Sequence, residues 1–138
     1  MERIETTAIR NLIHNEEYCR KVLPFIKEEY FIDRLEKLIF TEIYKFVNKY
    51  NNLPTKESLS IEMNTNKGVS EDEYKRMNEI ISSLNPEPIN LDWLVETTEV
   101  WCKDRAIHNA ILGGIQILDG KDKDHTPEYL PEMLSEAL

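Results

Sequence analysis

Residues 91–118, LDWLVETTEVWCKDRAIHNAILGGIQIL, constrain the fold more than any other segment. They predict one uninterrupted helix whose second half is apolar on nearly every side, since the polar residues between Ala106 and Leu118 are only His108, Asn109 and Gln116. Such a helix is about 42 Å long, whereas a compact domain of this chain length is about 37 Å across. We therefore expect the helix to protrude and its apolar end to need a partner. This favours an assembly module over a self-contained enzyme.

The composition suits one folded helical domain of 138 residues, with 41% hydrophobic and 31% charged residues. The net charge of -9 argues against tight nucleic-acid binding, because neutralising phosphates requires Lys and Arg. The acidity is interpreted as a means of solubility, or as an acidic face for a basic protein partner. No apolar run is long enough to span a membrane, and no secretory leader is present. We expect a cytoplasmic protein whose two cysteines, Cys19 and Cys102, stay reduced.

Helical periodicity and capping signals predict an all-α fold, with no strand pattern and no internal repeat. Asp33 is the predicted N-cap of the longest early helix, Ser70 and Glu73 form a predicted capping box, and Gly120 is the predicted stop of the long helix. A last helix, PEMLSEAL, is predicted to open at Thr126-Pro127 or at Leu130-Pro131. The other helices are predicted at residues 3–14, 16–23, 34–50, 55–63 and 71–84.

Two prolines in Asn85-Pro86-Glu87-Pro88 mark the clearest boundary in the chain, because they stiffen it into an extended connector. We predict a globular helical head at 1–85, the Pro-containing connector at 86–90, and a long helix, turn and returning helix at 91–138. The expected architecture is a compact multi-helix head followed by a protruding helical hairpin.

Motifs for nucleotide or metal binding fail on their spacing. Between Gly114 and Gly120-Lys121 there are five residues instead of the four of a P-loop, and Asp122 stands where a hydroxyl residue should follow. The three histidines are far apart, and no Cys/His ladder exists. Four residues near the end could attract a cation weakly, but without the spacing of a calcium loop: Asp119, Asp122, Asp124 and His125.

The cysteines do not suggest nucleophilic catalysis. Cys19 follows His14 by five positions, so the two side chains do not share a helix face. Cys102 falls on the apolar side of the long helix, where we expect a buried and inert thiol. We therefore assign no catalytic, cofactor-binding or metal-ligating residue to this chain.

The apolar second half of the long helix is the predicted self-association surface. Gly113-Gly114 costs about 1 kcal/mol per glycine relative to alanine, which a notch for a closely packed helix would offset; a kink is the alternative. Hairpins of two copies could cover each other in an antiparallel four-helix arrangement, or one chain could bury both apolar faces by itself. The predicted self-association residues, of which Trp101 has the strongest alternative role in the core, are Trp101, Ile107, Ile111, Leu112, Gly114, Ile115 and Leu118.

Three segments carry a resemblance to a known family, namely TAIRNLIHNEEYCRKVLPFIKEEYF, LEKLIFTEIYKFVNKYNNLPTKESLSIEM and WLVETTEVWCKDRAIHNAILGGIQI. They resemble the amino-terminal domain of DnaB-type replicative helicases and are most similar to those of T-even-type phages. The terminal YLPEMLSEAL also resembles a segment that these phage proteins carry shortly before their motor domain. The shared features are patterns of helix and proline placement rather than catalytic signatures.

The resemblance implies a non-catalytic collar domain of a hexameric, ATP-driven 5′→3′ DNA-unwinding motor in the host cytoplasm. It implies as partners a second copy, arranged as a trimer of dimers in the full hexamer, together with primase and the helicase motor domain. ATP and Mg²⁺ would bind the motor domain, and no cofactor is expected here. The last helix is either the returning hairpin arm, which we favour, or a linker that docks on a neighbouring motor domain. The alternative hypothesis to a helicase domain is a free-standing acidic helical adaptor or inhibitor protein of a phage.

Overall fold

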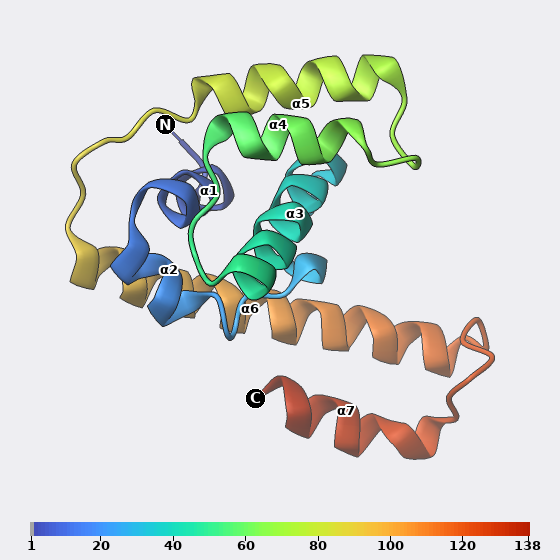
Figure 1. The fold of residues 1–138 in the computed structure, drawn as a ribbon. Coiled ribbons are helices and arrows are strands. Elements are labelled where there is room, and N and C mark those ends of the chain that lie inside the picture. The colour runs from blue at the N-terminus through green and yellow to red at the C-terminus, as the bar shows by residue number, and fades with distance from the viewer. Residues whose placement is uncertain (1) are drawn as a thin grey trace. The chain divides into compact units, whose positions relative to one another are not determined.

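The computed structural model describes residues 2–138, which form seven α-helices and two short 3-10 helices, with no strand in that range (Figure 1). The predicted all-α class is therefore confirmed. The elements in chain order are α1 (Ile4–His14), α2 (Glu16–Val22), η1 (Glu28–Tyr30), α3 (Arg34–Tyr50), α4 (Lys56–Asn64), α5 (Glu71–Ser83), α6 (Leu91–Leu118), η2 (Pro127–Tyr129) and α7 (Leu130–Ala137).

The Cα positions group into two compact units, Met1–Thr98 and Glu99–Leu138. The boundary lies inside α6, whose first two turns belong to the first unit. The division predicted from the sequence, into a head at 1–85, a connector at 86–90 and a hairpin at 91–138, stays a prediction.

The core of the first unit is built by α1, α2 and α3, with α4 and α5 lying side by side and packing on α3 (Figure 1). Phe31 and Phe40 stack in this core with ring centroids 5.0 Å apart. Its large side chains are almost completely removed from water, which supplies most of the driving force for folding. The largest of them are Tyr18, Phe31, Ile9, Leu12, Ile39, Ile43, Leu59, Met63, Met77, Ile81, Leu84 and Leu94.

Helix ends in the first unit follow the predicted capping chemistry. The Asp33 carboxylate accepts hydrogen bonds from the backbone N–H groups of Leu35 (2.8 Å) and Glu36 (3.0 Å), which otherwise lack partners at the start of α3. The capping box of Ser70 and Glu73 opens α5, and Thr55 caps α4 in the same way. These local signals place the helix starts within a residue or two of their predicted positions.

Side chains from α1 and α4 hold the C-terminal end of α5. The His14 Nε2–H donates to the carbonyl of Leu84 at 2.5 Å, and the Lys56 ammonium donates to the carbonyl of Ser82 at 3.0 Å. Basic groups are favourable here because the last carbonyls of a helix carry its negative dipole end. The Asn90 side chain then accepts from Trp93 N at 2.9 Å, so Asn90 caps the start of α6 at Leu91.

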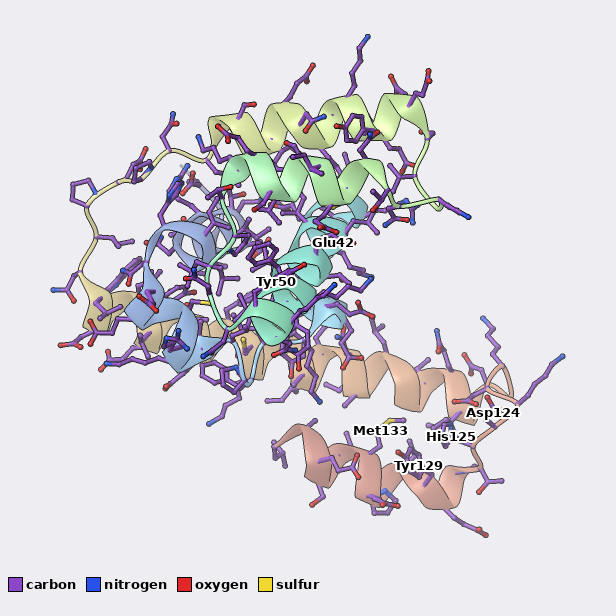
Figure 2. All side chains as sticks on the ribbon, in the orientation of Figure 1. Glu42, Tyr50, Asp124, His125, Tyr129 and Met133 are labelled. Carbon is purple, nitrogen blue, oxygen red and sulfur yellow. The ribbon has the colours of Figure 1, made fainter. Side chains whose placement is uncertain are left out.

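The second unit contains the rest of α6, a turn and α7. Gly120 ends α6 with φ +72°, a left-handed conformation that favours glycine, as predicted. The turn is organised by Asp122, whose carboxylate accepts from the N–H groups of Asp124 (2.8 Å) and His125 (3.1 Å). The His125 ring stacks on Tyr129 at 4.3 Å (Figure 2). Both predicted openings of the last helix are used, since η2 begins at Pro127 and α7 at Leu130.

The glycine pair of α6 lies against α7, which runs back beside the C-terminal half of α6 (Figure 1). A Cβ placed on Gly114 would lie 3.0 Å from Leu130 Cδ2, and one on Gly113 would lie 3.4 Å from Met133 Sδ. The pair therefore lies where another helix approaches closely, as expected, and that helix belongs to the same chain. That the two helices protrude from the head as a hairpin stays a prediction.

Candidate self-association surface

Four of the predicted self-association residues are exposed in the single chain, which is unusual for such large apolar side chains. Ile111 is 51% exposed and Ile115 49%, and Leu112 and Leu118 are 47% and 66% exposed. Ile111, Ile115 and Leu118 share one helix face because their spacing is i, i+4, i+7, and Leu112 lies at its edge. We call these four residues the exposed face of α6. Exposed apolar side chains that are clustered in this way often mark a site of interaction with another protein.

The other predicted residues are placed differently. Ile107 is half-buried, Gly114 is buried beside Leu130, and Trp101 is only 8% exposed within the single chain. The contribution of all three to self-association stays a prediction.

A second face of α6 was recognised from the sequence only at its glycine pair. Ala110, Gly113, Gly114 and Ile117 follow the i, i+3, i+4, i+7 spacing of one helix face, and Ala110 and Ile117 are 8% and 3% exposed. We call these four residues the glycine face. The spacing was available in the sequence, but the apolar residues on the neighbouring faces of the helix made this face hard to distinguish. Leu134 of α7 and Leu138, which follows it, remain exposed, and neither was predicted as part of a surface.

Both cysteine thiols are buried in non-reactive surroundings. Burial raises the pKa of the Cys102 thiol to about 12 and that of the Cys19 thiol to about 11. Because the thiolate is the nucleophilic form, neither sulfur is reactive at neutral pH. This agrees with the inert thiol expected at Cys102.

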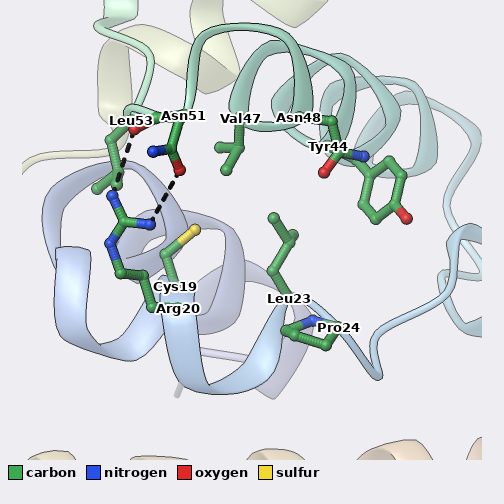
Figure 3. Close-up of a pocket in the computed structure, with 9 residues that line it drawn as sticks. All are labelled: Cys19, Arg20, Leu23, Pro24, Tyr44, Val47, Asn48, Asn51 and Leu53. Atoms are coloured by element: carbon green, nitrogen blue, oxygen red, sulfur yellow. Dashed lines mark hydrogen bonds between the residues drawn. The ribbon is translucent and has the colours of Figure 1, made fainter.

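A groove of about 610 Å³ runs between α2 and the C-terminal half of α3 in the first unit (Figure 3). On one side, the Arg20 guanidinium donates to the side-chain and backbone oxygens of Asn51, both at 3.3 Å. A neighbouring groove of about 490 Å³ shares Pro24 and Tyr44 with it. Apolar side chains and the amides of Asn48 and Asn51 line the first groove beside Arg20, and its thiol, Cys19, is buried. The second groove also carries the charged side chains of Lys27, Glu28 and Glu29.

A smaller pocket of about 190 Å³ lies between α3 and α4, where Glu42 and Tyr50 are labelled in Figure 2. Burial raises the pKa of the Glu42 carboxyl, against the effect of the Lys45 ammonium 3.8 Å away. Within residues 2–138, no three His, Cys, Asp or Glu side chains are grouped so as to hold a metal ion. None of the described helices has the length and apolar character needed to cross a membrane.

No family model matches this chain. Among known proteins, the chain is similar to the DnaB-like replicative helicase of Enterobacteria phage T4, with 33% identity over 109 residues. The predicted resemblance to a phage replicative helicase is confirmed. The aligned region covers 79% of this chain but only 23% of the helicase, so the chain spans about a quarter of that relative's length.

Proposed function

We propose that this chain is a non-catalytic collar domain of a phage replicative DNA helicase, and that it self-associates and docks primase during DNA replication. The similarity to the T4 helicase supports the replication role. The observation that carries the assembly role is the exposed face of α6, which remains in water when the chain is alone. Covering it with a second copy would remove apolar area from water at roughly 25 cal/mol per Å².

The proposed mechanism is geometric. In a ring-shaped motor, a domain that pairs with its neighbour holds the motor domains in register without taking part in ATP hydrolysis. The family resemblance supports a second copy as the occupant of the exposed face, because a closed ring is built from repeated contacts between identical chains.

The self-association test compares two isoleucine substitutions at exposed positions. Ile111→Asp places a carboxylate in the exposed face of α6, whereas Ile61→Asp makes the same change on α4, where Ile61 is 66% exposed. Light scattering should give a dimer or larger for the parent chain and for Ile61→Asp, and a monomer for Ile111→Asp with its helicity retained. A parent chain that is monomeric at tens of micromolar would overturn the proposed self-association.

Primase docking is proposed through acidic surface, since the chain carries a net charge of -9. The expected partner is a primase with a basic face, and binding measured by calorimetry should weaken steeply as salt is raised. Undetectable binding of the cognate primase to both the chain and the full helicase would contradict docking.

The DNA sequence downstream of codon 138 tests the collar assignment itself. The collar assignment requires a P-loop motor to follow in the same reading frame; otherwise the chain is the adaptor or inhibitor.

A further inference from the structure

The second half of α6 carries two apolar faces, of which one is covered within the chain and the other is exposed to water. Gly113 and Gly114 of the glycine face lie against α7, whereas the exposed face of α6 lies in water. Ile111 and Gly114 lie only three residues apart, yet about 50% of Ile111 is exposed and Gly114 is buried. The number of faces open to another copy therefore depends on whether α7 is docked.

The approach of α7 to α6 is tightest at Gly114. At 3.0 Å from Leu130 Cδ2, even the Cβ of an alanine at position 114 would force that leucine to shift. Two glycines inside a helix each cost about 1 kcal/mol relative to alanine. At Gly114, close packing against Leu130 offsets part of this cost, whereas a Cβ on Gly113 would make only an ordinary contact with Met133 Sδ at 3.4 Å.

Few features of α7 hold it against α6. α7 has eight residues, none of them is buried, and no side chain caps its first turn. An isolated helix of this length is unstable in water, so α7 depends on its contacts with α6 to stay folded. A single polar substitution on the contacting side should be enough to release it.

We propose that α7 acts as a cover for the glycine face, so that self-association uses one face of α6 and ends in a closed assembly. This inference rests on the self-association proposed above and adds its regulation. A helix with one open apolar face pairs with the same face of a second copy, and the contact is then complete. A helix with two different open faces can add a further copy on each side, which produces open-ended assemblies.

The experiment places one aspartate on either side of α7. Met133→Asp puts a carboxylate against Gly113, whereas Ser135→Asp adds the same charge on the exposed side of α7. In light scattering over a concentration series, the parent chain and Ser135→Asp should share one finite mass. Met133→Asp should show a roughly twofold or greater rise in average mass that grows with concentration. An unchanged mass for Met133→Asp would overturn the role of α7.

Gly114→Leu approaches the same question from α6. Its larger side chain displaces Leu130, and leucine is a better helix former than glycine, so α6 itself stays folded. Circular dichroism should show that helicity is retained, and the average mass should again rise. Adding Ile111→Asp to Met133→Asp should remove the open-ended growth, since one of the two open faces is lost.

Two outcomes separate the two proposals. A monomeric parent chain overturns self-association altogether. A parent oligomer of finite size that Met133→Asp and Gly114→Leu leave unchanged overturns only the role of α7.

Discussion

The hydroxyl groups of Tyr18 and Thr98 lie 2.7 Å apart, and both side chains are completely buried. Thr98 Oγ1 also donates to the carbonyl of Leu94 at 2.7 Å, so its oxygen is left to accept from the Tyr18 hydroxyl. This buried pair joins α2 to the second turn of α6 within the first unit.

The Tyr18–Thr98 pair should contribute measurably to stability. Thr98→Val removes the acceptor and should lower the free energy of unfolding by about 1–3 kcal/mol. Urea denaturation of Tyr18→Phe, Thr98→Val and the double variant should show a double-variant loss smaller than the sum of the two single losses. The control is Thr97→Val, at a half-buried position beside it, with an expected change within about 0.5 kcal/mol. Fully additive losses would show that the two hydroxyls do not act together.

The carboxylate of Asp33 should determine the stability of the start of α3. Asp33→Ala leaves the N–H groups of Leu35 and Glu36 without their partner, at a cost of about 1 kcal/mol. Asp33→Asn keeps an acceptor oxygen and should recover most of this loss. Thermal or urea unfolding measures both variants, and equal losses in Ala and Asn would assign the effect to charge alone.

Acid should weaken the contact between Arg34 and Glu73. The Arg34 guanidinium, 2.9 Å from Glu73, and the Ser70 N–H lower the pKa of the Glu73 carboxyl below its usual 4.5. A lowered pKa in the folded state means that the stabilisation is present above pH 4.5 and is lost as the pH falls through the folded-state value. Arg34→Gln should therefore reduce the slope of unfolding midpoint against pH in the acid range. An identical slope in parent and variant would contradict this.

Glu42 should show the opposite sign. Because burial raises its pKa above the usual 4.5, the folded state holds this proton more tightly than the unfolded chain does. Stability is then lost as the pH rises past 4.5, and the charged form is the unfavourable one. Glu42→Gln should stabilise the protein at pH 7 and have little effect well below pH 4.5. Denaturation at the two pH values tests this, and destabilisation at pH 7 would show that the ion pair with Lys45 outweighs burial.

Helix positions were predictable because their signals are local. Asp33, the Ser70–Glu73 box and Gly120 each act within a few residues, and α6 covers the predicted 91–118. The exposed face of α6 was included in the predicted surface for the same reason, since helical spacing alone brings its residues together.

The features that could not be predicted from the sequence depend on contacts between residues that are distant in the chain. Helical spacing cannot tell which of two apolar faces meets α7, and this is why Ala110 and Ile117 were missed. The hydrogen bond of His14 to Leu84 joins residues 70 positions apart and has no local signal. The groove between α2 and α3 likewise forms only when the two helices pack.

The burial of Cys19 and Cys102 has a practical consequence for every distance or fluorescence measurement on this protein. Maleimide reagents attack thiolates, and neither native sulfur supplies one to solvent near neutral pH. A single cysteine introduced on the surface should therefore take a dye or spin label selectively, with both native residues left in place.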